Sequence, residues 1–232
     1  MATPDKLYVA LIAIALTIDH FVLWRGFLRR SETDPARARI WIWSAWTIML
    51  WTLVAAGIAL WIVEERNWAS LWLVLPEGWW LVGAIVLVLA VLALYTRSVS
   101  KVSHLTPERR TALQSRFGDL DVLLPHTRTE LIWFIVLSLS AGFCEEFIFR
   151  GYLIWVLQPS LTLWGAAAFS VVLFAMAHAY QGSKGIMRTG TVGLLLTAVV
   201  LIFGSLLPAI IIHAVMDIGS GAGAWLVFRE PS

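Results

Sequence analysis

Seven apolar runs, joined by shorter polar segments, constrain this chain more than any other feature of its sequence. A helix needs roughly 20 apolar residues to cross a hydrocarbon core about 30 Å thick. The composition agrees, because 59% of the 232 residues are hydrophobic and 14% are charged, whereas soluble domains average about 25% charged residues. The sequence therefore predicts an all-α fold, a polytopic transmembrane helical bundle of about seven spans. The runs lie at residues 7–28, 40–63, 70–95, 131–157, 161–180, 189–203 and 205–228.

The connections between the runs differ in positive charge, which predicts how the chain is oriented. The first, third and fifth connections are rich in arginine or lysine, whereas the others carry at most one. Because basic connections favour the cytoplasmic side, we expect a multi-pass cell-membrane protein with its N-terminus outside and its C-terminus in the cytoplasm. The net charge of +2 does not favour a nucleic-acid partner. The single cysteine, Cys144, excludes an internal disulfide and is expected to be a small buried apolar residue.

The polar segment 96–130 divides the spans into two groups. We expect N-terminal transmembrane helices at 1–95, a polar and partly interfacial cytoplasmic connection at 96–130, and a C-terminal core at 131–228. Within the connection, Thr106 and Pro107 are typical of a helix start, with the Thr106 hydroxyl accepting from the first free N–H groups. An amphipathic helix at the membrane surface is expected there.

Ionisable residues inside the last spans are the strongest functional signal. Such a side chain costs at least roughly 2.5–3.5 kcal/mol at membrane depth on insertion scales, so it indicates a functional role. Counting about 1.5 Å per residue along the fourth, fifth and seventh spans places their ionisable groups at depths where they can meet. At that depth a straight fourth span would be too long, so we expect a kink at Gly142 or a start outside the membrane. The residues are Glu145, Glu146, Arg150, His178, His213 and Asp217.

Helical spacing distinguishes the two adjacent glutamates. Residues four apart share a helix face, whereas neighbours point about 100° apart. Glu146 and Arg150 are therefore expected to pair along one face, which leaves the carboxylate of Glu145 free. A free carboxylate beside a low-dielectric wall can act as a general base on water.

The same spacing gives each histidine a partner one turn away. His213 and Asp217 share a face, so Asp217 can orient or polarise the imidazole. Phe174 and His178 also share a face, which places an aromatic wall beside the second histidine.

Three motifs on successive hydrophobic segments resemble those of a known family. The run 145–151 resembles an EExxxR motif, 174–178 resembles FxxxH, and 213–217 resembles a histidine followed four residues later by Asn or Asp. In this order they resemble the CAAX protease and bacteriocin-processing family of intramembrane proteases, which includes the type II prenyl-protein endopeptidases. The resemblance covers about 130–228 and leaves the first three spans without support.

The resemblance implies an endopeptidase that hydrolyses a peptide bond by water attack. It implies that Glu145 activates the water, and that His178 and His213 hold that water or stabilise the oxyanion. Asp217 takes the place often filled by Asn. Substrates are expected to be peptides or proteins, prenylated or bacteriocin-like, presented in membrane lipid. The predicted site comprises the catalytic residues Glu145, Glu146, His178, His213 and Asp217, supported by Arg150 and Phe174.

A zinc site is the alternative to a site without cofactor. His178, His213 and Glu145 could be three ligands that leave a fourth position for water. The sequence has no HExxH, in which two ligands share one helix face. With Glu145 as a ligand, Glu146 would have to be the base, yet Glu146 is placed to pair with Arg150. Water activation by glutamate without a metal is therefore preferred.

Two other functions are compatible with the same ionisable residues. Glutamate, histidine and aspartate chains also serve in transporters and proton relays, and a non-catalytic immunity or scaffold protein could keep the ion pairs for stability. Asp19 and His20 in the first span are ambiguous, because they could pair with Arg25 or simply lie near a boundary. They are not assigned to the site.

Overall fold

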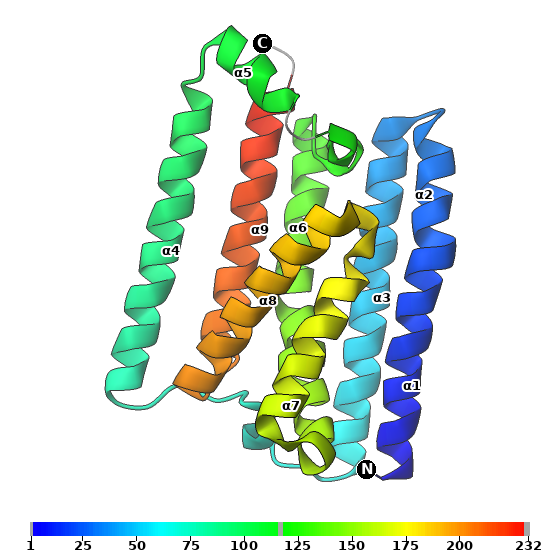
Figure 1. Cartoon of the computed structure of the whole chain (residues 1–232), viewed down its shortest axis with the longest axis vertical. Helices are drawn as coiled ribbons and strands as arrows, with labels where there is room; N and C mark the ends of the chain where they lie inside the picture. The colour runs from blue at the N-terminus through cyan, green and yellow to red at the C-terminus, as the bar shows by residue number, and fades with distance from the viewer. Residues whose placement is uncertain (1, 116–117, 230–232) are drawn as a thin grey trace.

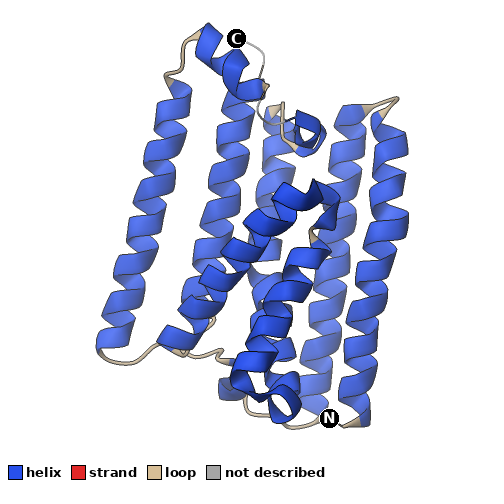
Figure 2. Cartoon of the chain, in the orientation of Figure 1, coloured by secondary structure: helices blue, strands red, loops and turns tan. Residues whose placement is uncertain are grey.

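The computed structural model describes residues 2–115 and 118–229, and every regular element within these residues is a helix (Figures 1 and 2). The all-α prediction is therefore confirmed for the described residues. Figure 1 shows the long helices packed side by side, with α1 beginning at one end of the bundle and α9 ending at the other. The elements are α1 (Thr3–Ile18), η1 (Asp19–Leu23), α2 (Trp24–Ser31), α3 (Pro35–Val63), η2 (Trp68–Leu71), α4 (Trp79–Ser103), α5 (Pro107–Gln114), η3 (Gly118–Leu123), α6 (Arg128–Glu145), η4 (Glu146–Leu153), α7 (Ile154–Ala177), η5 (Ala179–Gln181), α8 (Gly182–Phe203) and α9 (Leu207–Phe228).

Six helical stretches of the described chain are long and apolar enough to cross a membrane. One of them, Arg128–Ala177, has 50 residues and folds back at Thr162, where φ is 61° and ψ is 168°. A β-branched residue rarely adopts positive φ, and the nearby Pro159 lacks the N–H that a continuing helix would use. Figure 1 shows this reversal at the lower end of α7. The stretch therefore supplies two legs, which agrees with the predicted bundle of about seven spans.

Two predicted spans have different boundaries in the structure. The third begins at Trp79 rather than residue 70, and it continues to Ser103, inside the predicted polar connection. Gly78, with φ of 54°, ends the preceding irregular segment, and the fully buried Leu71 anchors that segment in the core. The helix that carries the sixth run begins at Gly182 rather than residue 189. Hydropathy locates an apolar run, whereas turn residues and packing decide where its helix begins.

The connection contains the predicted helix, but its start differs in one respect. Helix α5 begins at Pro107 as expected, whereas the Thr106 hydroxyl accepts no hydrogen bond from the first turn. The carboxylate of Glu108 instead accepts from its own backbone N–H and from Thr106, and these bonds lower the pKa of Glu108. The predicted Thr106 cap is therefore wrong, because a neighbouring carboxylate takes up the local donors.

Helix α6, which leads to the predicted site, has a stronger start. Thr127 and Glu130 form a reciprocal capping box, with Thr127 Oγ1 accepting from the Glu130 N–H at 3.2 Å and Glu130 Oε2 accepting from the Thr127 N–H at 3.1 Å. Glu130 Oε1 also accepts from Arg39 at 3.0 Å, and both side chains are buried. The capping box and this ion pair fix the beginning of α6 against α3.

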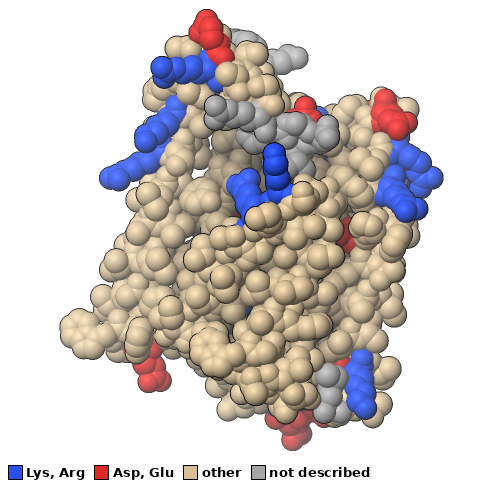
Figure 3. Space-filling view, viewed as in Figure 1, with Lys and Arg blue, Asp and Glu red and all other residues tan. Residues whose placement is uncertain are grey.

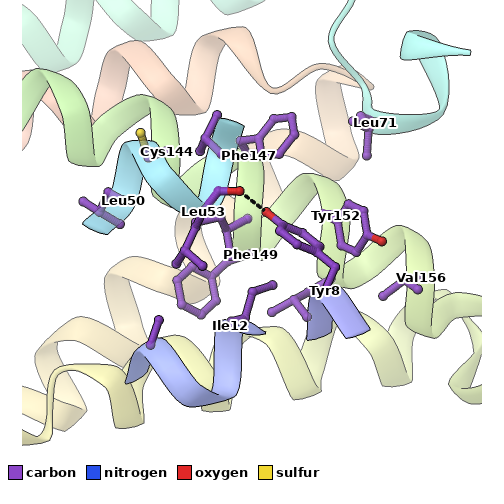
Figure 4. Close-up of a cluster of buried hydrophobic side chains, with 14 of the residues drawn as sticks. Tyr8, Ile12, Leu50, Leu53, Leu71, Cys144, Phe147, Phe149, Tyr152 and Val156 are labelled. Atoms are coloured by element: carbon purple, nitrogen blue, oxygen red, sulfur yellow. Dashed lines mark hydrogen bonds between the residues drawn. The ribbon is translucent and has the colours of Figure 1, made fainter. Parts of the chain in front are cut away.

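A buried apolar cluster joins the first spans to the fourth (Figure 4). The Tyr8 hydroxyl donates to the Leu53 carbonyl at 2.8 Å, and the Tyr8 ring meets Tyr152 edge-on with centroids 4.4 Å apart. A Cβ on Gly57 would lie 2.8 Å from Cζ of Tyr8, so this close approach requires glycine. Cys144 is a free, fully buried member of the cluster, as predicted. The cluster holds α1 and α3 against η4, which carries part of the site.

Candidate active site

The site begins in η4, where the fourth span changes from α-helix to a π-helical segment over Glu146–Leu153. All eight of its residues are buried. Such π-helical segments are rare and are frequent at functional sites. The segment follows directly on Glu145, the last residue of α6, so the two glutamates stand at the junction of two helix types.

The predicted ion pair between Glu146 and Arg150 is confirmed. Arg150 Nη1 donates to Glu146 Oε1 at 2.9 Å, and both side chains are fully buried. Arg150 also donates to the Gly193 carbonyl at 3.2 Å and to Thr197 Oγ1 at 3.4 Å. Its guanidinium carbon lies 4.1 Å from the centroid of the Phe174 ring. The arginine thus joins η4, α7 and α8, and its charge is balanced inside the bundle.

His213 is the second partner of Glu146. Its Nδ1 lies 2.8 Å from Glu146 Oε1. Because that carboxylate can only accept while it is paired with Arg150, Nδ1 carries a proton and a neutral His213 leaves the lone pair on Nε2. His213 Nε2 lies 3.8 Å from Glu145 Oε2 and 3.7 Å from Asp217 Oδ2. These distances exceed a direct hydrogen bond and leave Nε2 open toward two carboxylates.

Glu145 remains the least engaged member of the cluster. Its Oε2 is buried and has no hydrogen-bond partner within the described part of the chain. Its side chain is 14% exposed, whereas the side chain of Glu146 is 0% exposed. The expectation that Glu145 keeps an oxygen free is confirmed. The prediction that Glu145 and His213 can meet is confirmed, with Oε2 and Nε2 3.8 Å apart.

His178 ends α7 and is fixed by the residue one turn before it. Its Nδ1 lies 2.9 Å from the Phe174 carbonyl oxygen, and the two rings have centroids 4.9 Å apart. The Phe174 ring also meets that of His213 edge-on at 6.1 Å, so this phenylalanine lies between the two histidines. His178 is close enough to His213 and Asp217 for electrostatic interaction. The predicted pairing of Phe174 with His178 is therefore confirmed.

Asp217 is the most open member of the site, with 41% of its side chain exposed. It lies one turn from His213 on α9, as its spacing predicts, and it interacts electrostatically with Glu145 and His178 as well. The cluster thus reaches the protein surface through this carboxylate.

Gly142 has a different role from the predicted kink. A Cβ at this position would lie 2.9 Å from Cβ of Ala214 and 3.1 Å from the carbonyl oxygen of Ile210, both on α9. The glycine therefore permits close packing of α6 on α9. This close approach occurs one turn before Glu145 and next to His213, which brings the two side chains together.

Asp19, which the sequence left unassigned, lies close enough to the cluster to interact with it electrostatically. It begins the π-helical segment η1 in the first span, and 9% of it is exposed. Its Oδ1 accepts from Trp46 Nε1 at 2.5 Å, and its carboxylate interacts electrostatically with Glu145 and His178. The guanidinium of Arg25 lies over Phe21 instead. An acidic residue inside the first apolar run was the only signal in the sequence.

The proposed metal ligands do not form a recognisable ligand set. Over residues 2–115 and 118–229, no group of three or more histidine, cysteine, aspartate or glutamate side chains is arranged to hold a metal ion. The zinc alternative therefore finds no support in the arrangement of Glu145, His178 and His213.

The fold and the site together define a polytopic helical membrane protein. Its last spans bring two glutamates, two histidines and an arginine close together. Residues 127–219 match the family model described as type II CAAX prenyl endopeptidase Rce1-like. The match confirms, over this segment, the resemblance drawn from the three motifs. It supports the activity of an intramembrane peptidase in general. No curated protein and no solved structure matches the chain. The first three spans lie outside the matched segment.

Proposed function

We propose that this protein is an intramembrane endopeptidase in which Glu145 activates the attacking water. The main support is Glu145 Oε2, a buried oxygen without a partner among the described residues, 3.8 Å from Nε2 of His213. Glu146 is less suited, because its Oε1 already accepts from Arg150 and His213 and its side chain is fully enclosed. Both glutamates leave Oε2 without a partner among the described residues, but the side chain of Glu145 is 14% exposed and that of Glu146 is 0% exposed, so Glu145 is the carboxylate that water can reach.

The proposed reaction is a general-base hydrolysis. Glu145 takes a proton from water as the water oxygen bonds to the peptide carbonyl carbon, and the carbonyl electron pair moves to its oxygen. The tetrahedral oxyanion then collapses, the C–N bond breaks, and Glu145 returns the proton to the leaving amine. The products are a carboxylic acid and an amine, so all atoms of the water and the peptide bond are accounted for.

The two histidines supply Nε2 atoms to this reaction. Nδ1 of His178 is committed to the Phe174 carbonyl, and Nδ1 of His213 is committed to Glu146. In the neutral form, each Nε2 therefore accepts a hydrogen bond, which suits it to hold the attacking water. In the imidazolium form, each Nε2 donates and can stabilise the oxyanion. Asp217, 3.7 Å from His213 Nε2, balances that charge.

We propose that no metal takes part. The reaction above needs only Glu145 as base and the histidines as polar partners. Elemental analysis of the purified, active protein tests this directly, and activity should persist after dialysis against a strong chelator. Stoichiometric zinc, together with loss of activity on its removal and recovery on its return, would replace this proposal with the zinc alternative.

We also propose that the basic end of the bundle faces the cytoplasm. Figure 3 shows lysine and arginine gathered mostly at the end where α5 and the α2–α3 turn lie, above a broad, almost uncharged middle. Under the positive-inside rule, this end is cytoplasmic. A cysteine introduced at the exposed Thr33 should react with a membrane-impermeant thiol reagent only after the cells are opened, whereas one at the exposed Glu65 should react in intact cells. The reverse pattern would invert the orientation.

The decisive test compares Glu145→Gln with Glu32→Gln, which makes the same chemical change at an exposed residue. The probes are two quenched peptides that differ only in whether a cysteine near the C-terminus carries a prenyl group. Proteomics of cellular membranes is a second readout. The wild type and Glu32→Gln should cleave, and Glu145→Gln should not. Preference for the prenylated probe would support a lipidated substrate. Full cleavage by Glu145→Gln would overturn the proposed role, and ion movement without cleavage would indicate a transporter.

A further inference from the structure

His178 differs from Glu146 and His213 in its position along its helix. Glu146 lies inside a continuous helical stretch and His213 lies inside α9, but His178 is the residue at which α7 ends, with φ of −99° and ψ of 19°. The chain continues through the short 3-10 turn η5 to Gly182, whose φ is 75°. The Phe174 carbonyl holds Nδ1 of this imidazole, and the turn that follows His178 supplies a ring contact on another side.

Tyr180 provides such a contact. Its ring lies 5.9 Å from that of His178, and it packs against Trp24 at 5.0 Å and Trp46 at 5.4 Å between centroids. Trp24 belongs to α2 and Trp46 to α3, so the turn that follows His178 packs against two helices of the N-terminal spans. We call Trp24, Tyr180 and Trp46 the Tyr180 clamp.

Asp19 fixes one side of the Tyr180 clamp. Its Oδ1 accepts from the indole N–H of Trp46 at 2.5 Å, which sets the orientation of that ring. The carboxylate is nine-tenths buried and close enough to His178 for electrostatic interaction. Contacts therefore connect Asp19 to Trp46, Trp46 to Tyr180, and Tyr180 to His178. Of these four residues, only Tyr180 and His178 lie in the segment that matches the peptidase family.

We infer that Tyr180 is a positioning residue for His178, and that the first two spans serve the reaction by holding it through the Tyr180 clamp. This inference rests on the proposed function. A catalytic group displaced by about 1 Å can cost on the order of a hundredfold in rate, so loss of the clamp should act on turnover more than on substrate binding.

The first experiment compares Tyr180→Leu, Tyr180→Phe and Phe203→Leu with the wild type on the cleaved quenched peptide. Phe203 is a matched control because its ring packs on Trp80, away from the site residues. Tyr180→Leu should lower kcat by about tenfold to a hundredfold with KM nearly unchanged. Tyr180→Phe keeps the ring and should stay within about threefold of the wild type, as should the Phe203 control. Wild-type kcat in folded Tyr180→Leu would overturn the inference.

The second experiment tests whether the clamp works as one unit. If Tyr180 and Trp46 act together, Trp46→Leu should lower kcat as Tyr180→Leu does, and the double variant should lose no more than the more impaired single variant. Losses that multiply in the double variant would show two independent effects and would overturn the inference. Asp19→Asn keeps an oxygen for the Trp46 N–H, so it should lower kcat less than Asp19→Leu.

A third readout does not depend on activity. In ¹⁵N-histidine-labelled protein, the Nδ1–H of His178 should be protected from exchange by its bond to the Phe174 carbonyl. This protection should disappear in Tyr180→Leu and remain in Tyr180→Phe. Unchanged protection in Tyr180→Leu would overturn the inference, whether or not the protein cleaves peptides. Full activity of Glu145→Gln together with the expected loss of protection would instead reject the proposed function alone.

Discussion

Two buried carboxylate–arginine clusters at different places in the bundle differ in how completely their oxygens are satisfied. In the first, both oxygens of Asp5 accept from Arg66, at 2.8 and 3.2 Å, and Oδ1 also accepts from Tyr152 at 2.6 Å. In the second, Oε1 of Glu146 accepts from Arg150 and His213. Oε2 of Glu146 and Oε2 of Glu145 have no partner among the described residues.

The comparison teaches that burial of a charge does not by itself mark a reactive site. The Asp5 cluster ties the start of α1 and the loop after α3 to η4, and its satisfied oxygens leave nothing for a substrate. The glutamate cluster leaves acceptor atoms without donors, which is costly inside a protein unless water or substrate completes them. Unsatisfied oxygens, more than the ion pair, distinguish the candidate active site from a structural contact.

The largest expected effect comes from removing the reactive oxygen itself. Glu145→Gln should lower kcat by at least about a thousandfold, within the range of roughly 10²–10⁴ for loss of a general base. Thermal stability should change little, because the side chain has the same shape and the lost oxygen has no partner. The measurement is steady-state cleavage beside a thermal unfolding curve. A large fall in stability with normal kcat would place Glu145 with the structural cluster instead.

The next effect comes from removing one arginine from each cluster. Breaking a buried ion pair costs about 3–5 kcal/mol, because the partner charge remains buried. Arg150→Met should lower the free energy of unfolding by about this amount and also abolish turnover, since Glu146 would no longer orient His213. Arg66→Met should cost stability, but the folded fraction should keep wild-type kcat. Reversible unfolding in mixed micelles and kcat per folded molecule measure the two quantities.

A smaller change sharpens the same contrast. Tyr152→Phe removes only the hydroxyl that donates to Asp5, and hydrogen bonds to charged groups contribute about 1.5–3 kcal/mol. We expect a loss of stability in this range and unchanged kcat and KM. A selective fall in kcat would mean that the Asp5 cluster also positions η4 for catalysis.

The sequence predicted those parts of the site that depend on one helix. Glu146 with Arg150 and Phe174 with His178 are each four residues apart, and helical spacing brought both pairs together as expected. The apolar runs predicted the bundle for a similar reason, since the bilayer requires length and hydrophobicity of each span separately.

The parts that could not be predicted depend on packing between helices. Asp19 meets Trp46 across 27 positions, and Glu146 meets His213 across 67. No periodicity within a single span encodes such a contact. The same limit applies to the irregular segment around Leu71, where an apolar run enters the core instead of continuing a span.

The smallest expected effect concerns Asp217, the most exposed carboxylate of the site. Asparagine often occupies this place in the resembled family, and the 3.7 Å separation from His213 is too long for a direct hydrogen bond. Asp217→Asn removes one negative charge but keeps a polar side chain of the same shape, and Glu145 and Glu146 remain beside His213. We expect kcat to change by no more than about threefold, and stability by less than about 0.5 kcal/mol, as for most surface substitutions. Cleavage kinetics provide the check. A loss as large as that of Glu145→Gln would make Asp217 a second obligatory carboxylate, and the distinction between satisfied and open oxygens would have to include it.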